Sequence, residues 1–457
     1  MKTGLSEGGQ EGRCEKSRKM QERAPTVPAR AKQGAEVRDW SWVEASVWTE
    51  RMVSALDNGV QGGKWYSLMD KVERPKTLLR AWAEVKARKG AAGVDGLSVK
   101  RFERNSERYL REIEMDLKAG TYRPQPVRRV EIPKGDGKTR PLGIPVVKDR
   151  IVQTALKFAM EPIFEAQFLE TSYGFRPGRG CKDALRAVDE QLQAGFTWVV
   201  DADLQSYFDT IPHDALLAKV RQHISDGRLL ALIEAFLNQD ILHGVERWTP
   251  VSGTPQGAVI SPMLANLYLH DLDRLLADGG YRMVRYADDF VVLCESRGQA
   301  DKARDVVAEW TRSQGLTLHP EKTHVGDCLE EGQGFEFLGY RFEAGRRWVR
   351  KKSLKRFKDR VREATPRTRG RSLSSVVAEL NPMLRGWFGY FKHAHRNTFR
   401  DLDGFVRRRL RAMLRKQIKK PGMGLSFNDH QRWPNAFFAE AGLFTLSTAY
   451  QQARHSR

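Results

Sequence analysis

The chain has 457 residues, 40% of them hydrophobic, which is enough for about three domains with buried cores. No run of about eighteen apolar residues occurs and the polar N-terminus has no apolar signal segment, which excludes a transmembrane helix and a secretory signal. The four cysteines contain no CxxC pair, which excludes a zinc module and a disulfide framework. We therefore expect a cytoplasmic protein without a membrane partner.

The formal net charge of +21 at pH 7 is concentrated in one segment. Residues 346–420 contain 25 Lys and Arg against 5 Asp and Glu, a net of +20. A merely solubilised surface would spread its charge, so this asymmetry favours a polyanionic partner. Nucleic acid is the favoured partner, and an acidic membrane surface is the competing reading.

The first third of the chain reads as helices followed by a basic hairpin. A polar, flexible stretch is expected to lead into a helix near Trp40–Leu56, and apolar periodicity predicts another helix over 99–117. Alternation over 127–132 predicts a strand, and 133–145 follows as a Gly-rich basic turn. Lys and Arg at such a tip can hold a triphosphate. Taken alone, however, the stretch is more typical of an ordinary basic hairpin.

An apolar strand then runs into acids at Asp203. Asp201 shares the face of Asp203 because side chains in a strand alternate with a period of two. A capping role on the following helix is the alternative. Further on, 253–262 predicts a turn leading into a helix, with close backbone approach at its glycines.

The central motif is Tyr286-Ala287-Asp288-Asp289, which lies between two segments rich in β-formers. The pattern predicts a hairpin whose turn exposes two adjacent carboxylates. Hard cations such as Mg²⁺ prefer oxygen ligands, and a two-metal phosphoryl-transfer site needs acids from separate chain segments. The Asp-Asp pair alone favours a plain polar turn, but Asp203 supplies the second acidic strand end.

The basic segment has its own hydrophobic order. Apolar residues recur at helical spacing over 373–391 and again over 405–418, which predicts a small helical bundle. The basic residues between them are expected to face outward as a surface on the scale of phosphate spacing. These are Arg407, Arg408, Arg409, Arg411, Arg415 and Lys416.

Eight motifs, taken in order, resemble those of one family. They are Arg140-Pro-Leu-Gly-Ile-Pro, Tyr173-Gly-Phe-Arg-Pro, Asp203 with Phe208-Asp209, Thr254-Pro-Gln-Gly, Tyr286-Ala-Asp-Asp, Gly315-Leu-Thr-Leu-His-Pro-Glu-Lys-Thr, Phe337-Leu-Gly-Tyr and Leu380-Asn-Pro-Met-Leu-Arg-Gly-Trp-Phe-Gly-Tyr-Phe. The first seven resemble successive blocks of reverse transcriptases, and the last resembles the maturase motif (domain X) of group II intron-encoded proteins. The resemblance covers about Trp65 to Lys420, and eight motifs in one order make it specific.

The resemblance implies an α+β fold. It would be a right-hand polymerase, with fingers and an antiparallel palm sheet, plus an α-helical thumb and maturase domain. The implied division is 1–64 as a flexible basic and polar extension, 65–345 as reverse transcriptase fingers and palm, 346–425 as thumb and domain X, and 426–457 as a short C-terminal tail. No cysteine follows Cys328 and 37 residues follow Lys420, so the HNH endonuclease of many relatives is not expected.

The resemblance also implies site residues, carried over by position. The catalytic acids would be Asp203, Asp288 and Asp289, holding two Mg²⁺ ions with the backbone carbonyl of Leu204 as a further ligand. Lys134 (or Lys138 in its place) and Arg140 would hold the triphosphate of the incoming nucleotide, and Phe208 would exclude a ribose 2′-hydroxyl. Gln256 would line the nucleotide pocket. Lys322 would lie near the leaving pyrophosphate. The primer grip would be Phe337, Leu338 and Gly339.

The function implied is RNA-directed DNA polymerisation by two-metal nucleotidyl transfer. The enzyme would bind its group II intron RNA, assist its splicing and copy it into DNA during retrohoming. Its partners would be the intron RNA, a DNA target or primer and dNTPs, in a nucleoid-associated ribonucleoprotein. Two alternatives stay open: a domesticated reverse transcriptase in defence or DNA repair, and a splicing-only maturase. The intact acids argue against the second alternative.

Overall fold

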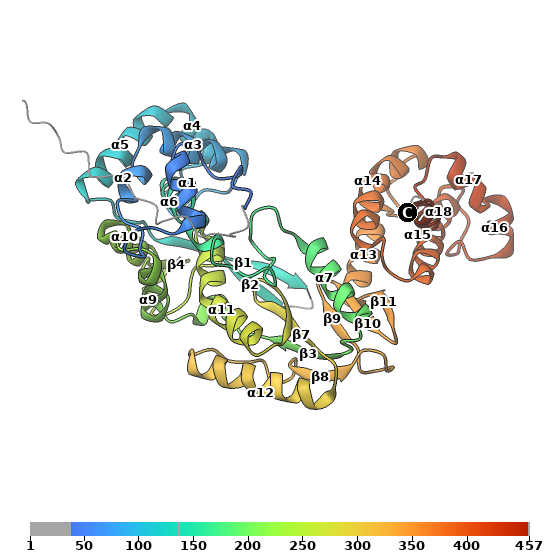
Figure 1. The fold of residues 1–457 in the computed structure, drawn as a ribbon. Helices are drawn as coiled ribbons and strands as arrows, with labels where there is room; N and C mark the ends of the chain where they lie inside the picture. The colour runs from blue at the N-terminus through green and yellow to red at the C-terminus, as the bar shows by residue number, and fades with distance from the viewer. Residues whose placement is uncertain (1–37, 136–137, 456–457) are drawn as a thin grey trace, which may run out of the picture.

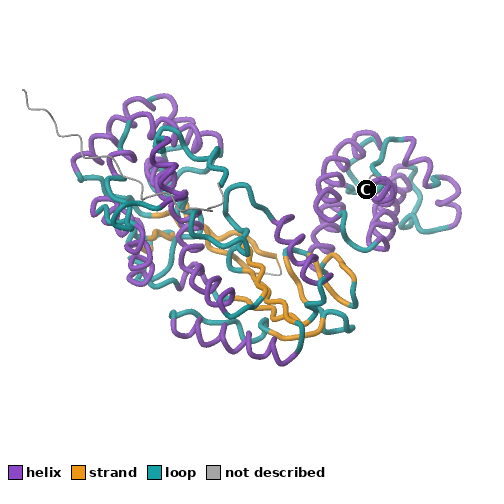
Figure 2. Tube along the Cα trace, in the orientation of Figure 1, coloured by secondary structure: helices purple, strands orange, loops and turns teal. Residues whose placement is uncertain are grey.

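The structure is a computed structural model that describes residues 38–135 and 138–455. Helices gather at the N-terminal end, the sheets lie in the middle, and a second group of helices stands at the C-terminal end (Figure 1). Figure 2 shows the strands concentrated between the two helical groups. The fold is mixed α and β with mainly antiparallel sheets, which confirms the predicted fold class in this coarse form. In the part described, no helix is both long and apolar enough to cross a bilayer.

Helices and strands have the following bounds. The helices are α1 (Glu50–Asn58), α2 (Met69–Val72), α3 (Pro75–Ala87), α4 (Val99–Arg104), α5 (Ser106–Ala119), α6 (Val147–Glu165), α7 (Cys181–Gln193), α8 (Tyr207–Thr210), α9 (His213–His223), α10 (Gly227–Leu237), α11 (Ser261–Asp278), α12 (Arg297–Ser313), α13 (Lys351–Ala364), α14 (Leu373–Phe391), α15 (Arg396–Gln417), α16 (Phe427–Arg432), α17 (Asn435–Glu440) and α18 (Leu446–His455). The strands are β1 (Val127–Gly135), β2 (Lys138–Ile144), β3 (Trp198–Asp203), β4 (Ile241–His243), β5 (Glu246–Trp248), β6 (Arg282–Tyr286), β7 (Asp289–Cys294), β8 (His324–Asp327), β9 (Phe335–Phe337), β10 (Tyr340–Glu343) and β11 (Arg346–Val349).

The central sheet has the strand order β6-β7-β3-β8, and all its pairs are antiparallel. Adjacent residues of β3 face opposite sides of the sheet and belong to different cores: Val200 packs with the N-terminal helices and Val199 with the C-terminal half. Helix α12 packs against β3, β7 and β8, while α7 packs against β6 and β7. Because the sheet is covered on both faces, β7 reads as a continuous apolar run after its acid.

A second sheet, in the order β2-β1-β4-β5, joins the N-terminal helices to the central part. Its β1–β2 hairpin is antiparallel, whereas β1 and β4 run parallel. The Gly143 backbone N–H donates to the Gln256 carbonyl at 2.6 Å, which ties this hairpin to the loop before α11. Gly257 has φ +112° and lies so close to the Gly143 carbonyl that a Cβ would overlap it.

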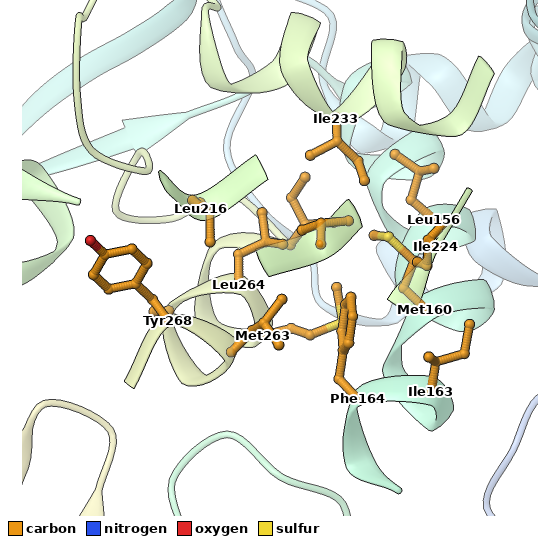
Figure 3. Packing of buried hydrophobic residues seen from close by; sticks show 14 of the residues in the cluster. Leu156, Met160, Ile163, Phe164, Leu216, Ile224, Ile233, Met263, Leu264 and Tyr268 are labelled. Carbon is orange, nitrogen blue, oxygen red and sulfur yellow. The ribbon is translucent and has the colours of Figure 1, made fainter. Parts of the chain in front are cut away.

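The largest core lies between α6, α9, α10 and α11. Its members include residues of α6 and α11 that lie close together in Figure 3, such as Met160, Phe164, Met263 and Leu264. This packing fixes α11, whose other end supports the central hairpin. The apolar periodicity of these segments is sufficient to explain their burial.

The N-terminal part of the described chain belongs to this core. Trp40 and Trp48 are buried, and the Trp48 Nε1–H donates to the Phe158 carbonyl at 2.7 Å. The flexibility expected up to residue 64 is therefore wrong from Trp40 onward, because its tryptophans supply apolar surface to the core. Residues 1–37 of the expected extension lie outside the described residues.

Several predicted elements differ from the structure. The helix expected near Trp40–Leu56 begins only at Glu50, and the turn expected over 133–145 is mostly strand, since β1 continues to Gly135 and β2 begins at Lys138. The helix expected over 99–117 is broken at Asn105, which ends α4 and precedes α5.

The segment 334–340 reverses direction. Its alternating aromatic residues favour a single strand, but it contains two strands, β9 and β10, joined by a turn at Leu338 and Gly339, both with positive φ. A two-residue turn with positive φ at both positions matches the right-handed twist of a hairpin. Sequence alternation alone did not reveal the reversal.

The core of α11 offers a test of these packing assignments. We expect Leu264→Ala, which truncates a fully buried side chain, to lower the free energy of unfolding by about 2–5 kcal/mol. Leu275→Ala, on the same helix but 41% exposed, is the matched control and should change it by no more than about 0.5 kcal/mol. Urea denaturation followed by circular dichroism measures both, and equal effects would contradict the assignment of Leu264 to the core.

Candidate active site

The β6–β7 hairpin carries the two adjacent carboxylates. Tyr286 pairs with Asp289 across it, so Ala287 and Asp288 form its two-residue turn. The predicted hairpin is present, but the expected exposure of both carboxylates in the turn is wrong: Asp289 is the first residue of β7, and both acids are partly buried. Asp203, at the end of β3, pairs directly with Asp289. Three acids from two chain segments therefore meet at one end of the central sheet.

Ala287 holds the strained position in this turn. Its φ is +60°, a left-handed conformation that costs an alanine roughly 1–2 kcal/mol. Gly174 lies against it so closely that a Cβ would overlap the Ala287 backbone nitrogen. The loop that contains Gly174 is fixed to β6, because the Tyr173 N–H donates to the Arg285 carbonyl and the Arg285 N–H donates to the Thr171 carbonyl, both at 2.9 Å.

A buried arginine holds the turn from beneath. The side chains of Arg285 and Asp273 are both 0% exposed, and the guanidinium Nε donates to the Asp273 carboxylate at 2.7 Å. Its Nη1 donates to the Ala287 carbonyl and to the Asn266 side-chain oxygen, both at 2.9 Å. The Asn266 amide in turn donates to the Gly174 carbonyl at 2.7 Å. One guanidinium thus connects helix α11, the Gly174 loop and the catalytic turn.

The carboxylates raise one another's pKa. Burial raises the pKa of Asp289 to about 7, and repulsion from Asp201, Asp288 and Asp203 adds to the effect. Burial also raises the pKa of Asp201 to about 7, with Asp203 contributing. The pKa of Asp288 is raised by burial and by Asp203. Such a set of crowded, oxygen-only donors has the chemistry that a hard divalent cation requires.

Lys322 meets this acid cluster directly. Its ammonium forms an ion pair with the Asp203 carboxylate at 2.5 Å, and both side chains are substantially exposed. Among residues 38–135 and 138–455, no three His, Cys, Asp or Glu side chains are gathered closely enough to hold a metal as they stand. The family resemblance implied that Lys322 lies near a leaving pyrophosphate. The structure places it next to Asp203, one of the acids expected to bind metal.

The expected nucleotide-binding residues converge in part. The Arg140 Nε donates to the Gln256 side-chain oxygen at 2.8 Å, across 116 positions of sequence. Arg140 also lowers the pKa of Asp288 and of Asp209 through its charge, although burial raises the pKa of both acids more strongly. A hollow of about 290 Å³ beside them is lined in part by Asp209 and Gln256. The side chains of Lys134 and Lys138 lie outside the described residues.

Phe208 and Leu204 are both buried close in sequence to Asp203. Phe208 is 7% exposed, and its carbonyl accepts from the Thr254 N–H at 2.6 Å. Leu204 is buried and forms a bridge with Leu318. The structure therefore joins Phe208 to the loop that contains Gln256, since Thr254 lines the same hollow as Gln256.

The turn expected as a primer grip is tied to the C-terminal helices. The Tyr390 hydroxyl of α14 donates to the Leu338 carbonyl, and the Tyr340 hydroxyl donates back to the Tyr390 carbonyl, both at 2.7 Å. Phe337 is fully buried, while Leu338 and Gly339 border a hollow of about 890 Å³. That hollow extends from Asp289 to α13 and α14 and includes Arg350, Arg356 and Arg360 in its lining.

The basic residues of α15 do not all face outward. The prediction for Arg411 is wrong: it is 2% exposed, and it donates to the Trp433 carbonyl at 2.8 Å and to the Asn435 side chain at 2.9 Å. Arg411 therefore fastens the chain after α15 to the bundle. Arg409 donates to Thr365 and Arg415 pairs with Asp429, so both are partly engaged. Arg408 and Lys416 are exposed, as the prediction of an outward basic surface requires. Arg407 is half-buried.

Residues 132–342 match the family described as reverse transcriptase (RNA-dependent DNA polymerase), and 354–433 match the maturase-specific domain of group II introns. Protein YkfC of Escherichia coli K12 is 35% identical over 359 residues, which cover 68% of this chain and 90% of YkfC. The chain belongs to the reverse transcriptases that carry a group II intron maturase domain. The predicted family and enzyme class, RNA-directed DNA polymerase, are thereby confirmed.

Other relatives of this reverse transcriptase match over shorter stretches. Group II intron-encoded protein LtrA of Lactococcus lactis subsp. cremoris is 38% identical over 204 residues, 44% of this chain and 34% of LtrA. The reverse transcriptase thus spans about a third of the length of LtrA. A solved partial Cas6-RT-Cas1–Cas2 complex matches 54% of this chain and 41% of its own at 26% identity, with a TM-score of 0.35. That likeness is too partial to bear on function.

The sequence reading of this reverse transcriptase did not find Arg285, Asp273 and Asn266. One signal was present, since Arg285 follows the apolar pair Met283-Val284 in a strand that continues into the acid-bearing turn. A charge at such a position has to be paired when the strand is buried. Its partners come from α11, 12 and 19 positions away in sequence, and spacing alone does not identify them.

Variants of the buried Arg285–Asp273 pair can separate its effect on protein stability from its effect on the position of the Ala287–Asp288 turn. We expect Arg285→Met to destabilise the reverse transcriptase by about 3–5 kcal/mol, because Asp273 is left buried and unpaired. The double variant Arg285→Met/Asp273→Leu should recover most of that stability. It should still extend a primer poorly, because the Ala287 carbonyl has lost its donor. Thermal unfolding and single-turnover primer extension on both variants measure this, and full activity in a stable double variant would contradict the positioning role.

Proposed function

We propose that this reverse transcriptase binds its group II intron RNA, assists its splicing and copies it into DNA. The observation that supports the polymerase part is the meeting of Asp203, Asp288 and Asp289 at one sheet end, on a turn held by Arg285. The maturase-specific match at 354–433 supports binding of intron RNA. The DNA target or primer and the dNTPs are partners within this proposal.

We assign the parts of the fold to a right hand. The β1–β2 hairpin with the N-terminal helices would be the fingers, the central sheet the palm, and α13 to α15 the thumb with domain X. We keep the division at 345/346. Residues 38–64 belong with the fingers because Trp40 and Trp48 are part of that core. The tail, 426–457, belongs with the thumb because Arg411 bonds to Trp433 and Asn435.

Divalent metal ions are general to reverse transcriptases, and we propose that Asp203, Asp288, Asp289 and the Leu204 carbonyl hold two Mg²⁺ ions here. When bound, they would supply charge neutralisation at the triphosphate and a lowered pKa at the attacking hydroxyl. The acids fit this role, because burial, with repulsion from the neighbouring acids added to it, raises the pKa of Asp289 to about 7, and a bound cation would offset both effects.

The chain's own residues provide the remaining functions. Arg140 would pair with the phosphates of the incoming nucleotide, and its bond to Gln256 would orient both side chains in the pocket. Lys322, now paired with Asp203, would release it to receive the leaving pyrophosphate. The Leu338–Gly339 turn would position the primer end, with Tyr390 holding the turn.

The acid turn provides the decisive test of the polymerase proposal. We expect Asp288→Ala to reduce DNA synthesis by orders of magnitude, because one ligand of the ions is removed beside a bound triphosphate. Binding of intron RNA should persist, since the basic surface lies elsewhere. Primer extension and filter binding on the same preparation compare the two, and equal loss of both would show that the variant has not separated catalysis from binding.

Phe208 provides an independent test of the nucleotide pocket. A ring packed beneath the sugar would clash with a 2′-hydroxyl, so Phe208→Ala should raise the use of rNTPs relative to dNTPs by about 10–200-fold. Steady-state incorporation of single nucleotides measures the ratio. An unchanged ratio with intact dNTP incorporation would remove Phe208 from the role of sugar selection.

Splicing is tested separately with a transcript of the intron and its exon ends. We expect the reverse transcriptase to accelerate splicing at low Mg²⁺ concentration, and Asp288→Ala to do so as well as the wild type. No acceleration by either protein would contradict the maturase part while leaving the polymerase part standing.

A further inference from the structure

A polar hollow lies between the first turns of α15 and helix α18. Its volume is about 680 Å³, within the range of ligand-binding clefts. Its lining residues are Arg396, Asn397, Arg400, Ser447, Tyr450, Gln451 and Arg454. We call this hollow the α15–α18 pocket. Four of these residues lie beyond position 433, where the match to the maturase-specific domain ends.

Helix α18 is built into the bundle and not loosely appended. Asp403 of α15 is 4% exposed, and its carboxylate accepts the Leu446 and Ser447 backbone N–H groups, both at 2.9 Å. The rings of Tyr450 and Phe399 pack with centroids 5.0 Å apart. The last helix therefore holds a defined position along α15, and the chain end lies among the C-terminal helices in Figure 1.

The segment before α18 is fixed in the same way. The Asn381 amide donates to the Gly442 carbonyl at 2.8 Å, and its oxygen accepts the Phe444 N–H at 2.8 Å. Leu443 and Leu446 are buried in the C-terminal core. Both walls of the α15–α18 pocket are thus rigid parts of one bundle, which lowers the entropy cost of binding there.

The residues that line the pocket give it a positive charge. It contains three exposed arginines and no acidic residue. Two acids lie close by but outside the lining. Asp401 meets Arg400 at 3.6 Å with both side chains about 70% exposed, so the pair is weak. Asp403 is buried, and its carboxylate is occupied by the Leu446 and Ser447 N–H groups. Arg396 is the first residue of a helix of 22 residues, whose N-terminal end adds partial positive charge.

This lining fits phosphodiester groups. Arginine guanidinium groups bind phosphate oxygens in a bidentate manner, and the Asn, Ser and Gln side chains add neutral hydrogen-bonding groups. Tyr450 offers a partly exposed aromatic edge on the same surface. An acidic protein surface would present carboxylates singly, whereas three arginines around one hollow suit a strand that carries one phosphate per nucleotide.

We propose that the α15–α18 pocket binds the sugar–phosphate backbone of the intron RNA, so that the C-terminal helix enlarges the RNA-binding surface beyond the maturase-specific domain. This inference rests on the proposed function, because it takes intron RNA as the partner. Arg396 and Arg400 would contact phosphates from one wall and Arg454 from the other. The pocket lies away from the catalytic turn, so it would serve affinity and placement of RNA and not nucleotide transfer.

The test compares two triple variants with the same loss of charge. In the first, Arg396, Arg400 and Arg454 are each changed to Ala. In the matched control, Arg297, Arg304 and Arg312 of α12 are each changed to Ala; Arg297 begins its helix as Arg396 begins α15. The probe is an in vitro transcript of a group II intron with its exon ends, with single-stranded DNA of the same sequence as a second arm. Dissociation constants are measured by filter binding at several salt concentrations.

We expect the pocket variant to bind the RNA more weakly, with a plot of log affinity against log salt that is shallower by about two, since each lost phosphate contact removes roughly 0.7. The control variant should keep the slope of the wild type. Both variants should keep the melting temperature and the primer-extension rate of the wild type on a short template, because no changed residue lies in the active site.

Each contrary result has one meaning. If the wild type binds the RNA and the pocket variant binds with the same slope, the pocket proposal is wrong and the proposed function stands. If the pocket variant loses affinity for the single-stranded DNA but not for the RNA, the pocket binds DNA and the RNA proposal is wrong. If the wild type itself fails to bind the RNA, the proposed function fails first.

Discussion

The Arg285 guanidinium lies fully buried between α11 and the β6–β7 turn, and the acid-bearing end of the central sheet depends on it. It pairs with Asp273 and donates to the carbonyl of Ala287, the residue that adopts a left-handed conformation next to Asp288. Breaking a buried pair of this kind is strongly unfavourable because one charge remains uncompensated. The strained turn therefore keeps its shape as long as the core holds α11 in place.

The rigid support from Arg285 matters because the acids of the neighbouring turn and strand repel one another. Burial and mutual repulsion raise the pKa of Asp201 and of Asp289 to about 7, so the acids would separate or take up protons if the backbone allowed it. The register of β3 and β7 prevents separation by pairing Asp203 with Asp289. Strand pairing and the buried arginine together hold a cluster of negative charge that a divalent cation can offset.

The C-terminal helices are connected to this site through short, specific bonds. The Tyr390 hydroxyl donates to the Leu338 carbonyl in the β9–β10 turn, and the Tyr340 hydroxyl donates to the Tyr390 carbonyl, so α14 is bonded directly to the expected primer grip. Further out, Asp403 and Asn381 hold the last helix against α15 and α14. A single continuous bundle therefore extends from the primer side of the active site to the α15–α18 pocket. RNA bound at the bundle and primer bound at the turn would share one rigid support.

The family, the reverse transcriptase chemistry and the central hairpin could all be predicted from the order of the residues. Tyr286 to Asp289 predict a turn between two strands from local composition, and the order of motifs supplied Asp203 as the partner acid. These features are short-range patterns or sequence motifs, which is why they are readable without coordinates. The concentration of charge in 346–420 likewise pointed to nucleic acid before any helix was seen.

The polar residues that support the site, and the basic residues that stay at the surface, became apparent only from contacts in the folded chain. Arg285 needed partners from α11, and Arg411 is buried because the chain after α15 folds back onto it, whereas periodicity placed it outward. The reversal at Leu338 and Gly339, the packing of Trp48 and the locking of α18 by Asp403 also depend on contacts between distant segments. Sequence patterns report the preferences of neighbouring residues, but the partner of a buried charge is set by the packing of whole elements.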